Sequence, residues 1–337
     1  DDADPGKTYL RFRLSSDADL SFDGLALDGE VEDYVGYIQM VDHGDAPLAG
    51  TAPHMFTRSP SVLGDPLVIN GPWLGDTQPD HDLPMPLGGF DDDDTTAGVD
   101  DEDEGQIVFS NSLGLAGLIP GEQATVTFTV SNAVGVVYGW IDFNGDGDFD
   151  DAGELIVPGV TVDPATAGTG QHTFDVPLVD VAPETVAARF CVVEPGDAWT
   201  PGPTGVAYSG EVEDFTVTVL PIDFGDAPNS GDPLTYPSFP TRRADDGARH
   251  VIDVTGPWLG AVAPDHDRDG QPTALAHGDG TDEDGLDFLG ALLIPNETAT
   301  LAVTVTTGSV IDAANPVYLN AWIDYNGDGM WEAAEHI

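Results

Sequence analysis

The amino-acid sequence repeats itself, and this constrains the fold more than any other feature. Residues 29–34 (GEVEDY) return as residues 210–215 (GEVEDF), and residues 44–47 (GDAP) return as residues 225–228, in both cases 181 positions later. Self-similarity at a fixed spacing indicates one structural unit that is used more than once. The sequence therefore predicts a tandem array with a period near 181 residues.

The chain is out of phase with this period. Its beginning matches the end of a repeat, one whole repeat follows, and the last part starts another repeat and stops soon after the acidic loop of that repeat has returned. The expected segments are terminal strands at 1–40, an acidic loop-rich segment at 41–105, a sandwich at 106–220, a second acidic segment at 221–285 and the start of a truncated sandwich at 286–337. Two explanations stay open: the chain is cut from a longer array, or its two ends complete one domain between neighbouring subunits.

The second part of each repeat has the pattern of β-structure. Within residues 123–130, Thr125, Thr127 and Thr129 alternate with Val126, Phe128 and Val130, and residues 298–305 alternate in a similar way. This period of two is typical of a half-buried strand. Further strands are expected at 136–141, 172–178, 186–193 and 212–220. The predicted fold class is all-β, with tandem immunoglobulin-like β-sandwiches joined by Asp/Gly/Pro-rich calcium-binding loop regions.

The charge of the chain is extreme, with 61 acidic residues against 9 basic ones and a formal net charge of −52. Such a polyanion is repelled by nucleic acid and by anionic membrane surfaces, and its own repulsion opposes compaction unless cations bind. Specific divalent-cation sites and adaptation to high salt both explain this acidity. Because the acids gather in glycine-rich loops, we favour cation sites, and the two explanations can coexist.

Two loops have the sequence D-x-N-x-D-G directly after a short apolar strand, beginning at Asp142 and at Asp324. Oxygen side chains at alternate positions followed by glycine suit a hard cation such as Ca²⁺. Glu335 stands at position twelve of its loop, the bidentate position, whereas Glu154 stands at thirteen, one residue late. The candidate ligands are Asp142, Asn144, Asp146, Asp148, Asp150 and Glu154 in the first loop, and Asp324, Asn326, Asp328, Glu332 and Glu335 in the second. A polar turn without metal is the alternative.

A further D-x-D-x-D-G loop stands in the second repeat only, since Pro84 replaces the third aspartate in the first. The candidate ligands outside the D-x-N-x-D-G loops are Asp265, Asp267, Asp269, Asp282, Asp284, Asp101, Asp103, Asp226 and Asp45. His81 and His266 alternate with the paired aspartates, so we expect both imidazoles to face solvent.

The GEVED segment offers another pair of acids. On a strand, Glu211 and Glu213 point to the same face, where they repel each other unless a cation or an arginine lies between them. Two interpretations stay open. The two glutamates complete the coordination shell of a cation in the Asp142 loop or in the acidic segment before it, or they are solvated side chains at the start of a strand. Cys191, the one cysteine, lies in an apolar run and is expected in the core.

In this order, the motifs GEVEDY/F, GDAP, DEDG and WIDFNGDG resemble the GEVED-domain repeats of large secreted bacterial surface proteins. The resemblance covers nearly the whole chain. It implies a β-sandwich module in extracellular, adhesin-like or surface-layer-like proteins, with several bound Ca²⁺ ions.

Three classes of function remain. The first is a non-enzymatic, extracellular structural or adhesive array, such as a stalk, fibre or surface layer. Its partners would be other copies of the chain or neighbouring repeats, and strand complementation is one mode of assembly. The second is a calcium-dependent adhesin module for a surface glycan or protein, with Trp73, Trp199, Trp258 and Trp331 as aromatic platforms. The third, an enzyme, is disfavoured because the sequence carries no recognised catalytic motif.

Overall fold

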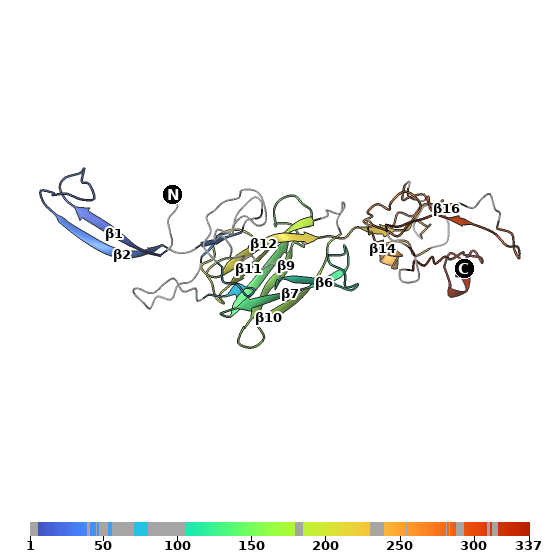
Figure 1. Ribbon diagram of the computed structural model, residues 1–337, viewed down its shortest axis with the longest axis horizontal. Coiled ribbons are helices and arrows are strands. Elements are labelled where there is room, and N and C mark those ends of the chain that lie inside the picture. Colours follow the sequence, from blue (N-terminus) through green and yellow to red (C-terminus); the bar gives the residue numbers. More distant parts are fainter. Residues whose placement is uncertain are drawn as a thin grey trace. The chain divides into compact units, whose positions relative to one another are not determined.

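The computed structural model describes residues 6–38, 41–44, 46, 53–55, 71–79, 106–178, 185–229, 239–253, 255–280, 282, 284–287, 293–308, 311 and 316–337 (Figure 1). Within these ranges the protein is all-β. Short 3₁₀ turns in the described residues include η2 (Arg243–Asp245) and η3 (Ala333–Glu335). No helix of the described residues is both long and apolar enough to span a membrane.

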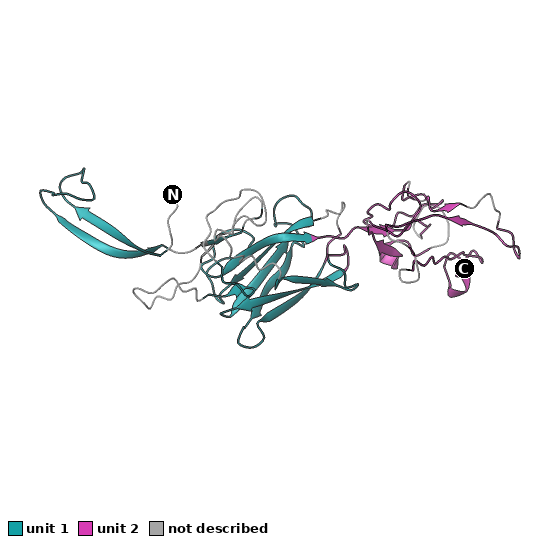
Figure 2. Cartoon of the chain, viewed as in Figure 1, with its two compact units in different colours: residues 1–116, 123–175, 185–217 teal, residues 117–122, 176–184, 218–337 magenta. Residues whose placement is uncertain are grey.

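The chain divides into two compact units (Figure 2). Unit 1 consists of residues 1–116, 123–175 and 185–217, and unit 2 of residues 117–122, 176–184 and 218–337. The boundary differs from the expected domain limits, because short stretches from within the 106–220 segment belong to the second unit.

Two four-stranded sheets form a sandwich in unit 1. One sheet has the order β10-β7-β5, with β6 also pairing with β7, and the other has the order β12-β11-β8-β9. The strands of the first are β5 (Trp73–Leu74), β6 (Val108–Asn111), β7 (Gln123–Ser131) and β10 (Thr169–Asp175). Those of the second are β8 (Gly135–Ile141), β9 (Leu155–Val162), β11 (Thr185–Val193) and β12 (Glu211–Thr218).

The alternation in the sequence explains how the first sheet packs. Along β7, the alanine, valine and phenylalanine side chains are buried and the threonines are partly exposed, as a strand covered on one face requires. Phe128 of β7 lies with its ring 6.5 Å from that of Phe190 on β11, so aromatic side chains join the two sheets. β11 is buried along almost its entire length because it is a central strand.

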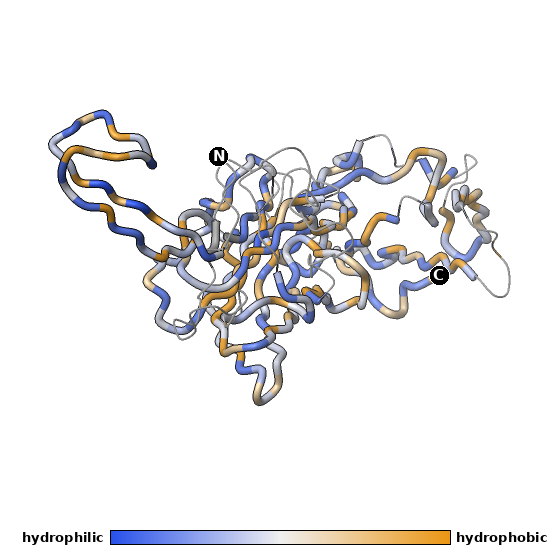
Figure 3. The backbone as a smooth tube through the Cα atoms, turned by 60° about the vertical axis from the view of Figure 1, so that its left-hand side comes forward, coloured by the Kyte–Doolittle hydropathy of each residue, from blue (hydrophilic) through white to orange (hydrophobic). Residues whose placement is uncertain are grey.

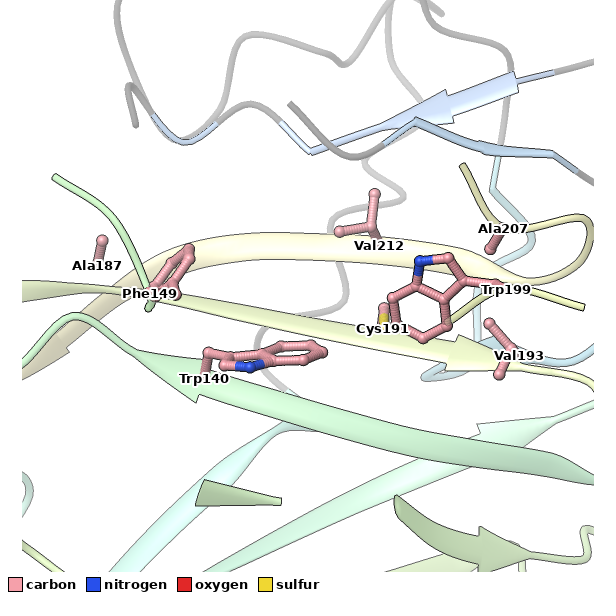
Figure 4. Packing of buried hydrophobic residues seen from close by; sticks show 8 residues of the cluster. All are labelled: Trp140, Phe149, Ala187, Cys191, Val193, Trp199, Ala207 and Val212. Atoms are coloured by element: carbon pink, nitrogen blue, oxygen red, sulfur yellow. The ribbon is translucent and has the colours of Figure 1, made fainter. Parts of the chain in front are cut away.

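A second apolar cluster includes Trp140, Phe149 and Trp199 (Figure 4). Trp140 and Trp199 meet edge to face with ring centroids 6.5 Å apart, an arrangement that aromatic quadrupoles favour. Cys191 lies in the same cluster, which confirms its expected core position. Burial raises the pKa of its thiol.

The acidic loop-rich segments contribute short strands. β5 pairs with the end of β7, with Trp73 opposite Ser131. In unit 2, β15 (Trp258–Leu259) pairs with β18 (Val305–Thr306) in the same way, with Trp258 opposite Thr306. The segments that hold these tryptophans were expected to be loops, because a two-residue strand leaves no periodic pattern in the sequence.

Unit 2 consists of small sheets rather than a second sandwich in its described residues. β13 (Ile222–Phe224) pairs with β14 (Arg249–Val251), and β16 (Leu286–Asp287) pairs with β17 (Ala302–Val303). Ile119, Ile222 and Phe224 form a small buried cluster. Among the described residues, therefore, only one sandwich of the expected tandem is present.

The N-terminal residues form a two-stranded hairpin of β1 (Gly6–Leu14) and β2 (Glu30–Ile38). Leu10, Phe12 and Leu14 alternate with Arg11 and Arg13, and Figure 3 shows this change between hydrophobic and hydrophilic residues along the hairpin. A shorter pair, β3 (Val41–His43) and β4 (Pro53–Met55), follows.

Candidate metal sites

The first D-x-N-x-D-G loop connects β8 to β9 at one end of the sandwich. Asp142 directly follows β8 and its side chain is buried. Its Oδ1 accepts a hydrogen bond from the Gly145 amide at 2.7 Å, and its Oδ2 accepts one from the Gly147 amide at 3.1 Å. Both glycines have positive φ, 71° and 91°, which explains why the turn requires them.

The next oxygen side chains wind round the same turn. Asn144 Oδ1 accepts the Asp146 amide at 2.9 Å, and Asp148 Oδ1 accepts the Asp150 amide at 2.9 Å. The side-chain Nδ2 of Asn144 also donates to the carboxylate of Asp151. Asp151 was not among the expected ligands, although it lies in the same acidic run.

Glu154 closes this loop from the start of β9, and its side chain is only 2% exposed. One carboxylate oxygen, Oε2, accepts the Asp151 amide at 3.0 Å. The other, Oε1, is buried and has no hydrogen-bond partner among the described residues. Burial, together with the charges of Asp142, Asp151 and Asp146, raises the pKa of Glu154 to about 7.

The second loop repeats this arrangement in unit 2. Asp324 Oδ1 accepts the Gly327 amide at 2.6 Å and Oδ2 accepts the Gly329 amide at 2.9 Å. Glu335 is buried, but both of its oxygens are satisfied: Oε1 accepts the Tyr325 amide at 3.0 Å, and Oε2 accepts the Glu332 amide at 3.1 Å.

Glu154 and Glu335 occupy equivalent places despite the extra residue in the first loop. The Ile141 amide donates to the carbonyl of Glu154 at 3.0 Å, and the Ile323 amide donates to that of Glu335 at 3.1 Å. The first loop thus accommodates its additional residue between the aspartates and the closing glutamate. Counting positions along the sequence could not show this.

A third group of acids lies in unit 2. Carboxylate oxygens of Asp265, Asp267 and Asp279 lie within 4.8 Å of one another, and so do those of Asp223, Asp279 and Asp282. Asp279 belongs to both sets, is 8% exposed, and has a buried Oδ1 without a hydrogen-bond partner among the described residues. Burial and the charges of Asp267, Asp282 and Asp223 raise the pKa of Asp279 to about 8.

Asp223 and Asp279 were not among the ligands expected from the sequence. Asp279 lies outside the D-x-D-x-D-G pattern, and Asp223 lies on β13, far away in sequence. Folding brings both to Asp267, whose backbone amide donates to the Ile222 carbonyl at 2.8 Å. In the sequence, nothing but their acidic side chains marked Asp223 and Asp279 as candidate ligands.

Other expected ligands bind backbone amides in the structure. Asp269 Oδ1 accepts the Arg243 amide at 2.7 Å. Asp226 Oδ2 accepts the Gly278 amide at 2.5 Å, and Asp284 Oδ2 accepts the Ala261 amide at 3.0 Å. Asp45, His81, Pro84, Asp101 and Asp103 lie outside the described residues.

His266 differs from its expected position. It is half-buried rather than directed into solvent, and its Nδ1 accepts a hydrogen bond from the Ile222 amide at 3.1 Å. The prediction of a solvent-facing imidazole was wrong for His266, because the Asp265 loop is not a regular strand.

The GEVED acids are buried at the start of β12. Glu211 Oε2 accepts the amide of Leu74 at 2.5 Å, so it binds the short strand β5. Asp214 pairs with the guanidinium of Arg189 and also accepts the Ala46 amide at 2.8 Å. The pairing of Asp214 with Arg189 was not predicted. Its signal in the sequence was the presence of an arginine inside an apolar run, in a chain with only 9 basic residues.

The fold and these acidic loops define an all-β module with several candidate cation sites. Residues 136–218, from β8 to β12, match the family model of the GEVED domain, which confirms the resemblance for this stretch. The match includes both the Asp142 loop and the GEVED segment. No curated protein and no solved structure matches the chain.

Proposed function

We propose that this chain is a non-enzymatic, calcium-stabilised repeat protein of an extracellular structural or adhesive array, such as a stalk, fibre or surface layer. One observation carries the proposal: the Glu154 carboxylate, buried behind the Asp142 loop with one oxygen that no described residue satisfies. A buried carboxylate oxygen without a partner is costly, and a bound cation removes that cost.

The chemistry of the loop suits calcium. Ca²⁺ takes six to eight oxygen ligands in flexible geometry, and carboxylates and amide carbonyls are its usual protein ligands. Asp142, Asn144, Asp146, Asp148 and Glu154 would hold the ion. A divalent charge there would offset the mutual repulsion of the acids and would tie the end of β8 to the start of β9.

The Asp279 cluster supports more than one such site. It again combines several carboxylates with a buried, unpartnered oxygen. A ligand that binds only the folded state stabilises it by mass action. Several sites of this kind would let a chain with a net charge of −52 remain compact without disulfides.

The alternative, a calcium-dependent glycan- or protein-binding adhesin module, relied on exposed tryptophans. Trp199 instead packs in the core cluster, and Trp73 and Trp258 lie within short paired strands. Trp331 alone of these four is exposed. These positions favour a structural role, and a glycan array probed with and without calcium separates the two.

Thermal unfolding tests the proposal in three conditions: with Ca²⁺, after removal of divalent ions by EGTA, and in EGTA with high NaCl. We expect EGTA to lower Tm and NaCl to leave most of the loss in place. Recovery by NaCl alone would make the acidity a halophilic surface and would overturn the calcium proposal.

A matched pair of variants makes this test specific to the site. Glu154→Gln keeps the size of the side chain and removes its charge, so we expect most of the calcium-dependent rise in Tm from this loop to disappear. Glu297→Gln removes an equal charge from an exposed position and should leave the calcium response intact.

A further inference from the structure

The Asp279 cluster of unit 2 gathers carboxylates from three separate stretches of the chain (Figure 2). All of its members belong to residues 218–337, so the cluster lies within one compact unit. Its members are Asp223 on β13, Asp265 and Asp267 in the D-x-D-x-D-G loop, and Asp279 and Asp282 in the acidic run that follows.

Hydrogen bonds hold the D-x-D-x-D-G loop against β13. The Ile222 amide donates to His266 Nδ1 at 3.1 Å, and the Asp267 amide donates to the Ile222 carbonyl at 2.8 Å. The Phe224 amide in turn donates to Asp267 Oδ2 at 3.0 Å. The Asp267 carboxylate is thereby fixed beside the strand that carries Asp223.

The acidic run is held to the end of the same strand. Asp226 Oδ2 accepts the amide of Gly278, the residue directly before Asp279, at 2.5 Å. Gly280 has φ of 96°, a backbone conformation that glycine adopts without strain, and the turn there returns the chain so that Asp282 lies near Asp279. The fold therefore builds the cluster from fixed backbone positions.

Asp279 has a buried carboxylate oxygen that points to a cation. The residue is 8% exposed, and its Oδ1 has no hydrogen-bond partner among the described residues. Leaving such an oxygen unsatisfied in the interior is costly, especially among other carboxylates. A cation inside the cluster provides the partner that this oxygen needs.

The carboxylates form two groups that share only Asp279. Oxygens of Asp265, Asp267 and Asp279 lie within 4.8 Å of one another, and oxygens of Asp223, Asp279 and Asp282 do the same. Ca²⁺ binds its oxygen ligands at about 2.3–2.6 Å, so three oxygens with these separations can surround one ion. Each group is therefore part of the coordination shell of one cation.

The charge of the cluster also favours more than one ion. Its five carboxylates carry five negative charges when ionised, so one Ca²⁺ leaves three of them unbalanced and two Ca²⁺ ions leave one. Like charges at close range in a partly buried site repel strongly, because little water screens them.

We infer that the Asp279 cluster binds two Ca²⁺ ions, which the Asp279 carboxylate bridges with one oxygen on each ion. Asp265 and Asp267 hold one ion, Asp223 and Asp282 hold the other, and water completes both shells. The inference rests on the calcium binding of the proposed function. The ion pair would tie β13 to both loops.

Counting bound ions in variants of the full chain tests this arrangement. Asp223→Ala removes a ligand from one group, and Asp265→Ala removes a ligand from the other. Native mass spectrometry of metal-stripped chain, reloaded at the lowest Ca²⁺ concentration that saturates the wild type, gives the number of ions. We expect one ion fewer in each single variant and two fewer in the double variant.

The double variant separates a two-ion site from a one-ion site. If all the carboxylates surrounded one ion, the double variant would lose no more ions than either single variant, and the inference would be overturned. An unchanged count in all three variants would overturn it as well. Asp253→Asn, which changes an exposed acid outside the cluster, is the control.

Electron paramagnetic resonance with Mn²⁺ provides a second measurement, on the unmodified chain. Mn²⁺ accepts the same carboxylate and water ligands as Ca²⁺. Ions that share a bridging ligand lie about 3.5–4 Å apart and couple magnetically. We expect a coupled spectrum from the Mn²⁺-saturated chain and its loss in Asp279→Asn, because the single amide oxygen of asparagine cannot bridge two ions. A spectrum of isolated Mn²⁺ ions alone would overturn the inference.

The same ion counts distinguish this inference from the calcium proposal. If the wild-type chain binds no Ca²⁺ at all, both fail. If Glu154→Gln loses an ion while the cluster variants keep all of theirs, the calcium proposal stands and the two-ion site is wrong.

Discussion

Arg189 and Asp214 form a two-pronged ion pair that is enclosed in the sandwich, with nitrogen–oxygen distances of 2.7 and 2.5 Å. Arg189 also donates to the Pro203 carbonyl at 2.8 Å. The carboxylate additionally accepts the Ala46 amide, so it joins β11, β12 and the segment before the sandwich. Asp214 of the GEVED motif therefore connects three parts of unit 1 through its side chain.

Asp214→Asn should strongly destabilise the sandwich. It leaves Arg189 buried beside a neutral group, and breaking a buried pair in this way costs about 3–5 kcal/mol. Urea unfolding followed by tryptophan fluorescence measures the change. Asp33→Asn removes the carboxylate at the equivalent position of the first GEVED motif, where the pair with Arg11 is exposed, and should change the unfolding midpoint little because solvent screens the pair. Equal effects of the two variants would contradict the structural role of burial.

Gly210→Ala should also destabilise the sandwich. The residue has φ of 88°, and a Cβ would lie 1.7 Å from the Val192 carbonyl oxygen, so the turn before β12 would have to open. We expect a loss well above the ~1 kcal/mol of an average substitution. Gly225→Ala, where a Cβ meets no atom within 4 Å, is the control. Similar unfolding midpoints for both variants would show that the close approach is not required.

Without divalent ions, stability should fall as the pH rises from about 4.5 to about 7. The pKa of Glu154 is about 7 in the folded protein against an ordinary value of 4.5, so the folded state holds the proton more tightly. Between these values the unfolded state has lost the proton and the folded state keeps it, hence the free energy of unfolding decreases with pH. Asp279, with a pKa of about 8 against 3.8, acts in the same direction over a wider range.

Urea unfolding of metal-stripped protein at a series of pH values measures this slope. Glu154→Gln should reduce it, because the variant has no proton to lose at that position. Added Ca²⁺ should restore stability mainly at the upper end of the range, where the carboxylates are ionised. A slope that is unchanged in Glu154→Gln would rule out Glu154 as its source.

Asp279→Asn should remove one calcium site from unit 2. Its carboxylate is common to both groups of neighbouring acids, so replacing it weakens each group. Calorimetric titration should show one fewer ion bound per chain. Asp253→Asn is the control, since Asp253 is exposed and asparagine can keep the bond that its Oδ1 accepts from the Thr255 amide. An unchanged number of ions in Asp279→Asn would contradict the site.

The sequence by itself determined the longer strands of the sandwich and the two D-x-N-x-D-G loops. Alternation along residues 123–130 depends only on neighbouring positions, and so does the D-x-N-x-D-G order at Asp142 and Asp324. The structure places β7 and both turns there. Local physics is sufficient for such elements, because a strand with one covered face and a glycine-containing turn are specified within a few residues.

Tertiary structure decided the contacts between distant residues. It brought Asp223 to Asp279, set Arg189 against Asp214, and paired Trp73 with Ser131. It also made Glu154 and Glu335 equivalent although the counting differs by one. Such contacts depend on how strands pack around a core, and a loop can absorb an extra residue while its two ends stay in place.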